Sequence, residues 1–131
     1  KAYVHPNSNL DGVLYNAVHH YHPCTVWTME SDSNYNWHYE HFVALHNEFI
    51  YRYGKTHRSF DLLGDILKTP PRNIPVGPKT PFKLAMGIAP QCINTSDPVG
   101  SYRAFYQTKQ ERFSMDWSKR PVPEWFNFLT A

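Results

Sequence analysis

The longest stretch of helix-period spacing lies between residues 34 and 53, and the other predicted elements flank it. Aromatic side chains recur there at three- and four-residue steps, which places them on one face of a helix. These positions are Tyr35, Tyr39, Phe42, His46, Phe49 and Tyr53. A neighbouring row is mostly polar or titratable and consists of Asn34, His38, His41, Leu45, Glu48 and Arg52. The pattern predicts a helix that packs its rings and turns the polar row outward to a partner.

Both ends of this helix carry recognisable cap residues. Residues 31–34 are all good N-cap types, so the helix start is secure while the choice among the four stays open. Gly54 can adopt the left-handed conformation that ends a helix. Glu48 and Arg52 are spaced i,i+4, which predicts a surface ion pair worth roughly 0.3–0.5 kcal/mol.

Shorter helices are predicted on either side of the long one. The predicted ranges are 24–30, 60–68, 98–113 and 123–126. Pro23 suits the first turn of a helix, Ser59 is the expected cap of the second range, and either Ser96 or Asp97 can cap the third. In the third range the aromatic residues, Tyr106 and Phe113 among them, are assigned to the packing side, and the last range is expected to seat Trp125.

Residues 71–98 are rich in proline, glycine and threonine, which leaves little room for regular structure. Apolar residues recur within them as possible anchors: Ile74, Val76, Phe82, Leu84, Met86 and Ile88. A loop this long is unusual in a compact domain, so we expect an ordered loop held on the core. No strand-period alternation stands out. The chain of 131 residues is therefore predicted to be one all-α domain, a small bundle of about three main helices with a long Pro-rich loop.

Composition adds three expectations. The chain has 4 Trp, 9 Tyr and 8 Phe, so its core should be built from rings whose polar groups need partners when buried. Cys24 and Cys92 can form at most one disulfide, and buried thiols are the favoured alternative. No apolar run of about 18 residues is present, so no transmembrane helix or membrane partner is expected.

The net charge of +2 is unevenly distributed. Residues 1–65 contain four basic and seven acidic residues, whereas residues 66–131 contain nine basic and four acidic residues. This distribution favours a locally basic surface, with an ordinary solvated loop as the alternative. Duplex DNA is the partner that such a surface suggests. The candidate contacts are Arg52, Lys55, His57, Arg58, Arg72, Arg103, Lys119 and Arg120.

Catalytic and metal-binding candidates are also present. Glu48 is the carboxylate best placed for acid–base work, with His41 on the same row, and a purely structural Glu48–Arg52 pair is the alternative. The His-rich segments offer possible metal ligands: His19, His20, His22, Cys24, His38 and His41. Their spacing matches neither a zinc finger nor the HExxH motif, so no cofactor is predicted and a metal-dependent enzyme stays an alternative.

Four segments together resemble a family of largely uncharacterised bacteriophage proteins. They are HPCTVW, NYNWHYEHFVALHNEFIYRYGKTH, DPVGSYRAFYQTKQERF and KRPVPEWF. Family members usually have an additional N-terminal segment, and this chain begins at Lys1 without Met, so an N-terminal truncation is expected. The resemblance implies a phage-encoded protein of the host cytoplasm during infection, or of the virion.

More distantly, the long helix and the basic turn resemble the pyrimidine-dimer DNA glycosylases, small all-α repair enzymes. The N-terminal amine and early glutamate that these enzymes use would both fall upstream of Lys1. The resemblance therefore implies a glycosylase-related DNA-binding protein whose catalytic N-terminus is absent here. The alternative function is a virion or assembly component that binds other phage proteins, because ring-rich, Pro-rich sequences suit interfaces.

Overall fold

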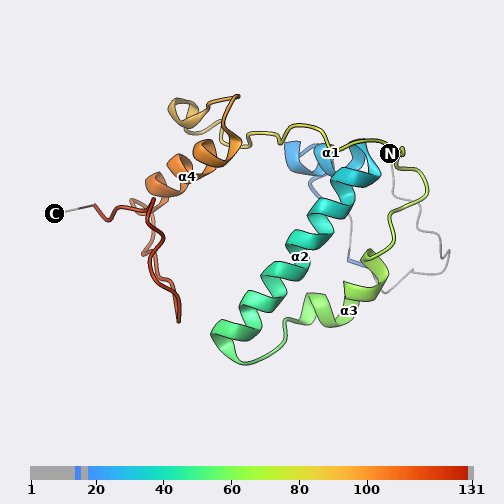
Figure 1. The fold of residues 1–131 in the computed structure, drawn as a ribbon, viewed down its shortest axis with the longest axis horizontal. Helices are drawn as coiled ribbons and strands as arrows, with labels where there is room; N and C mark the ends of the chain where they lie inside the picture. The colour runs from blue at the N-terminus through green and yellow to red at the C-terminus, as the bar shows by residue number, and fades with distance from the viewer. Residues whose placement is uncertain (1–13, 16–17, 130–131) are drawn as a thin grey trace. The chain divides into compact units, whose positions relative to one another are not determined.

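A computed structural model describes residues 14–15 and 18–129 of the chain. Regular structure among them is helical throughout, with no strand in the described part, which confirms the predicted all-α fold (Figure 1). The elements are α1 (Pro23–Glu30), α2 (Asp32–Tyr53), α3 (Arg58–Leu67), the 3₁₀ turn η1 (Pro90–Cys92) and α4 (Pro98–Lys109).

The chain forms two compact units, Lys1–Pro81 and Phe82–Ala131. The first contains α1, α2 and α3, and the second contains η1 and α4. The boundary falls inside the long Pro-rich loop, which is irregular apart from η1, as predicted. Of the expected anchors in this loop, Ile74 and Met86 are buried, whereas Val76 and Ile88 are exposed.

The predicted caps of α2 are confirmed. Ser31 is the N-cap, and its Oγ accepts a hydrogen bond from the Asn34 amide at 3.1 Å. Gly54 ends the helix with a φ of 68° and donates its amide to the Ile50 carbonyl at 2.8 Å. The helix is therefore fixed at both ends by residues that the sequence marks locally.

The aromatic row of α2 packs against α3, and its hydroxyl groups find backbone partners there. Tyr35 Oη donates to the Leu67 carbonyl and Tyr39 Oη to the Gly64 carbonyl, each at 2.7 Å. A Cβ at Gly64 would lie 3.0 Å from the ring of Phe60, so a larger residue there would require this ring to shift. The two tyrosines thus bind two carbonyls in the last turn of α3, where carbonyl groups lack partners within the helix.

Deeper along the same face, His46 is buried and stacks on Phe60 with ring centroids 3.9 Å apart. The ring of Phe42 also contacts Phe60, with ring centroids 5.2 Å apart. The Nδ1 atom of His46 is buried and has no hydrogen-bond partner among the described residues. The imidazole therefore serves here as a flat packing group.

Two helix starts differ from the prediction because histidines cap them. His57, and not Ser59, is the N-cap of α3, and its Nδ1 accepts from the Ser59 amide at 3.1 Å. His22 caps α1 in the same way, accepting from the Cys24 amide at 3.1 Å. An imidazole nitrogen thus replaces the usual hydroxyl or carboxylate acceptor, and α3 begins at Arg58, two residues earlier than predicted.

After α3 the chain returns to the corner between α1 and α2 (Figure 1). Residues 75–80, called the belt below, bind this corner through backbone and side-chain hydrogen bonds. These are Asp32 N to Pro75 O, Ser31 Oγ to Pro78 O, Ser33 Oγ to Gly77 O and Gly77 N to Asp32 Oδ1, at 2.6–3.0 Å. The helix-capping segment 31–34 therefore also fixes the belt.

Asn34 lies at the centre of this corner and is fully buried, so its predicted place on the outward row of the long helix was wrong. Its Nδ2 donates to the Trp27 carbonyl at 2.7 Å and to Thr80 Oγ1 at 2.8 Å. Its Oδ1 accepts from the Thr80 amide at 2.9 Å. Helical periodicity could not reveal this burial, because the belt that covers Asn34 arrives from 46 residues away.

In the second unit, Asp97 caps α4 by accepting from the Gly100 amide at 3.0 Å, which decides between the two predicted caps. The helix ends at Lys109 and not at the predicted residue 113. Beyond it, Gln110 Nε2 donates to the Asn127 carbonyl and Gln110 Oε1 accepts from the Leu129 amide, at 2.9 and 2.7 Å. The polar side of α4 thus binds the C-terminal segment.

Gln107 repeats this pattern one turn earlier. Its Nε2 donates to the Trp125 carbonyl at 2.6 Å, and its Oε1 accepts from the Asn127 amide at 3.3 Å. The predicted short helix at 123–126 is wrong: a single turn, closed by Phe126 N to Pro123 O at 3.0 Å, leads into an extended segment. The amide of Asn127 is bound by Gln107 and that of Leu129 by Gln110, so neither amide is available to continue a helix.

Candidate functional site

The connection between α2 and α3 carries the densest group of predicted DNA contacts. Lys55, His57 and Arg58 are exposed, and Arg52 lies half-buried at the end of α2. These four residues are called the cationic turn below. The turn is short and lies between the Gly54 cap of α2 and the His57 cap of α3, so the backbone that carries its cations is held at both ends.

Two carboxylates lie close to the cationic turn, and both are engaged. Glu48 Oε2 accepts from Arg52 Nε at 2.8 Å, and Asp61 Oδ2 accepts from Thr56 Oγ1 at 2.8 Å. Lys55 and Arg58 have no such carboxylate partner among the described residues. The turn therefore keeps a local excess of positive charge facing water.

His57 is held in place by two contacts. Its Nδ1 caps α3, and its ring meets Phe49 edge-on with centroids 5.1 Å apart. Because Nδ1 accepts the Ser59 amide, the remaining ring nitrogen, Nε2, is the one that can donate to an external acceptor. The imidazole can thus present one donor beside the two free cations.

The predicted catalytic pair is not brought together. Glu48 and His41 lie on one face of α2 but are seven residues apart, a rise of about 10 Å along the axis. Glu48 instead forms the ion pair with Arg52, and the ring of His41 stacks on Trp37 with centroids 5.5 Å apart. The contacts correspond to the structural Glu48–Arg52 alternative, and nothing in them points to acid–base work.

His38 has a more specific environment. Its Nδ1 lies 2.8 Å from Thr28 Oγ1, and that hydroxyl donates its proton to the Cys24 carbonyl at 2.7 Å. Nδ1 must therefore carry a hydrogen and donate to Thr28. Desolvation of the ring, and then the charge of neighbouring His41, hold the pKa of His38 below its usual value of about 6.5.

The histidines in the described part of the chain do not assemble a metal site. Within residues 14–15 and 18–129, no group of three or more His, Cys, Asp or Glu side chains could hold a metal ion. His22 is occupied as a helix cap, His38 binds Thr28, and His41 stacks on an indole. Cys24 and Cys92 are half-buried thiols. The metal-dependent alternative thus finds no ligand set in the described part of the chain.

The other predicted DNA contacts are distributed over both units. Arg72 is exposed in the first unit, whereas Arg103, Lys119 and Arg120 are exposed in the second. Lys119 has a φ of 60° in the turn closed by Arg120 N to Trp117 O, a conformation that favours glycine. The cationic turn is thus the part of the predicted set that one short segment brings together.

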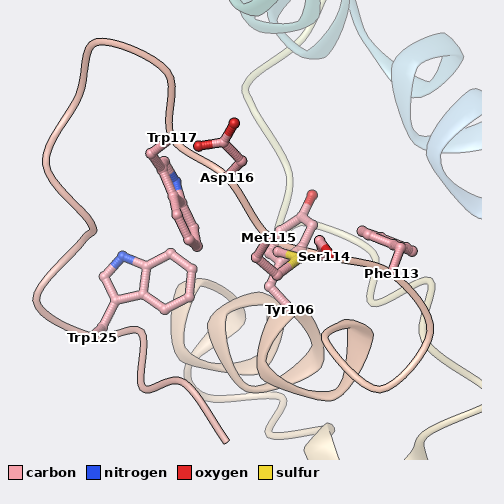
Figure 2. Close-up of a pocket in the computed structure, with 7 residues that line it drawn as sticks. All are labelled: Tyr106, Phe113, Ser114, Met115, Asp116, Trp117 and Trp125. Carbon is pink, nitrogen blue, oxygen red and sulfur yellow. The ribbon is translucent and has the colours of Figure 1, made fainter.

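A pocket in the second unit was not predicted. Its cavity volume is about 330 Å³, and it lies between α4 and the segments that follow it (Figure 2). The lining residues are Tyr106, Phe113, Ser114, Met115, Asp116, Trp117 and Trp125. Tyr106 and Phe113 were predicted to be packing residues. The one sequence signal for an aromatic surface here is that two tryptophans, Trp117 and Trp125, follow α4 closely.

No family model, curated protein or solved structure matches this chain. The resemblance to phage proteins and to DNA glycosylases therefore stays a prediction. Among the described helices, none has the length and apolar character needed to span a bilayer. The function is therefore inferred from the residues of this chain.

Proposed function

We propose that this protein binds duplex DNA, with the cationic turn contacting the phosphate backbone. The observation that carries the proposal is the grouping of Lys55, His57 and Arg58 on one exposed, capped connection. Basic side chains on a capped turn suit phosphates because the backbone that carries them need not be ordered on binding.

The physical expectation is a salt-dependent, largely sequence-independent affinity. Each phosphate neutralised by a lysine or arginine releases counterions and adds about 0.9 to the slope of log K against log salt concentration. Contacts by Lys55, Arg58 and Arg52 would give a slope of roughly −2 to −3. No base-reading role is assigned to the turn, since phosphate contacts carry no sequence information directly.

The proposed function is DNA binding, and no catalysis is assigned to α2. Glu48 is engaged by Arg52, and His41 is about 10 Å further along the axis, so neither is assigned a catalytic role. The predicted kinship with DNA-repair glycosylases agrees with DNA as the partner, and in those enzymes the chemistry belongs to an N-terminal amine.

Filter binding to a 20-base-pair duplex at low salt tests the proposal. The double variant Lys55→Ala/Arg58→Ala should weaken binding at least 10-fold and reduce the salt slope by about 2. Lys68→Ala is the matched control, because this exposed lysine lies at the opposite end of α3, about 15 Å away along the axis. Equal affinity of the double variant and the wild type would overturn the proposal.

A second candidate, a virion or assembly component, is favoured by exposed apolar and aromatic side chains on α2. Leu45 and Tyr51 are exposed, at 57% and 48% of their accessible surface, on two different sides of this helix. Exposed apolar and aromatic groups suit a protein partner. If the predicted phage origin holds, stoichiometric recovery of the protein in purified particles would support this candidate, and recovery only from infected-cell lysate would count against it.

A further inference from the structure

We infer that the pocket of the second unit binds a nucleotide, with an unpaired base stacked on its tryptophan rings. The site is separate from the cationic turn and is made entirely of residues 106–125. Its ligand class follows from three properties of the lining: open ring faces, hydrogen-bonding groups without partners, and nearby positive charge.

Two of the rings that line the pocket, Trp117 and Trp125, are packed against the buried ring of Phe126. Trp117 packs on Phe126 with centroids 4.7 Å apart, and Trp125 packs on the same ring at 6.0 Å. The described ring contacts include none between any two of Tyr106, Phe113, Trp117 and Trp125. Figure 2 shows the two indoles at one end of the pocket, away from Tyr106 and Met115. Aromatic faces of this kind stack with nucleobases at about 1–3 kcal/mol per base.

The wall is also fixed in advance. Gln107 Nε2 holds the Trp125 carbonyl at 2.6 Å, and Phe126 behind it is 5% exposed. Tyr106 stands on α4 itself. A ligand would therefore meet surfaces that lose little freedom on binding, which removes part of the entropic cost.

Asp116 and Ser114 supply the polar groups of the pocket, and neither has a hydrogen-bond partner among the described residues. A carboxylate accepts hydrogen bonds from exocyclic amino groups such as those of cytosine and adenine. Thymine and uracil lack that amino group. Asp116 is thus expected to favour an amino-bearing base.

The positive charge beside the pocket argues against the main competing ligand, a methylated ammonium group. Aromatic pockets with a carboxylate also suit methylated ammonium groups. Here, however, the Arg103 guanidinium lies 5.5 Å from the Trp125 ring, and Lys109 Nζ lies 5.3 Å from the Tyr106 ring. These two cations lie within about one Debye length of the rings that they cover and outnumber Asp116, so a cationic ligand is repelled while a phosphate is attracted.

The cavity volume agrees with a ligand of this size. At about 330 Å³ it lies near the lower end of the range in which small-molecule sites fall, about 300–1,000 Å³. One flat base fits such a space better than an extended chain. The nucleotide could be free or part of a single strand, and the experiment separates these sources.

Titrations of the full chain with dCMP, dTMP, oligo(dC) and oligo(dT) eight-mers, followed by tryptophan fluorescence, test the inference. Saturable quenching is expected with the cytosine ligands, about 10-fold tighter than with thymine. Tighter binding of the eight-mer than of dCMP indicates a strand; equal binding indicates a free nucleotide. Both results support the pocket, and absence of saturation by any of the four overturns it.

Variants separate the pocket from the cationic turn. Asp116→Ala, an exposed change that removes the acceptor and should not disturb folding, is expected to abolish the preference for cytosine, and Trp125→Phe should weaken all four ligands. Lys55→Ala/Arg58→Ala should leave dCMP quenching unchanged. Cytosine preference retained in Asp116→Ala, or displacement of dCMP by millimolar tetramethylammonium, would overturn the inference. Neither result would affect duplex binding by the turn.

Discussion

The two units fix their irregular segments by different means. In the first unit, the belt is held by partly buried hydrogen bonds with residues 31–34 and Trp27, including one from Trp27 Nε1 to the Thr80 carbonyl at 3.1 Å. In the second unit, the C-terminal segment is held by rings that pack on Phe126 and by two glutamines, Gln107 on α4 and Gln110 directly after it.

The difference teaches where each unit is vulnerable. A buried polar network is directional, and loss of one member leaves its partners without hydrogen bonds in a place that water does not reach. A cluster of rings loses contact area in proportion to what is removed. Damage to the first unit should therefore depend on which polar atom is lost, and damage to the second on how much ring is lost.

The largest effect is expected from Phe126→Ala. This ring is 5% exposed and touches Trp117, Trp125 and Phe128. Its loss should lower the free energy of unfolding of the second unit by about 3–5 kcal/mol, measured by urea denaturation. Phe128→Ala, at a ring that is 54% exposed, is the control and should cost much less. Equal costs would show that burial does not organise this cluster.

Asn34→Ala should have the next largest effect. It removes the partners of the Trp27 carbonyl and the Thr80 amide, which predicts a loss of about 2–4 kcal/mol in the free energy of unfolding. Asn36→Ala, on the exposed side of α2, should stay within about 0.5 kcal/mol of wild type. Faster hydrogen exchange at the Thr80 amide would locate the damage in the belt. Unchanged exchange there would contradict the proposed role.

The smallest effect concerns pH. Because the pKa of His38 is lowered in the folded state, the unfolded chain binds the proton more readily. The contribution of His38 to stability is therefore complete above about pH 6.5 and decreases as pH falls from there through the folded-state pKa. Denaturation series at pH 5 to 8 should show a shallower dependence in His38→Asn, which keeps a donor near Thr28. An unchanged slope would contradict this assignment.

The features that the sequence predicted correctly depend on neighbouring residues. The α2 caps at Ser31 and Gly54, the aromatic row and the Glu48–Arg52 pair all follow from local spacing. The burial of Asn34 was missed because its partner Thr80 lies 46 residues away. The pocket was missed for the same reason, since Trp125 contacts α4 through Gln107 and Arg103, which lie 18 and 22 residues earlier in the chain.

The histidine N-caps of α1 and α3 were not predicted, for a different reason. His22 and His57 both precede helices at positions where hydroxyl and amide residues are expected, so His22 was considered as a metal ligand and His57 as a DNA contact instead. The polar row was likewise treated as one outward surface, although only part of it faces water. Periodicity shows which residues share a face but not what covers that face.

The attachment of the belt decides where this protein can be cut. A fragment ending after α3 would contain every helix of the first unit, yet the corner at Asn34 would be left open to solvent. Expression boundaries placed by helix content alone would therefore give an unstable product. A workable fragment must continue past the last helix to Thr80, because a dozen residues without regular structure complete its core.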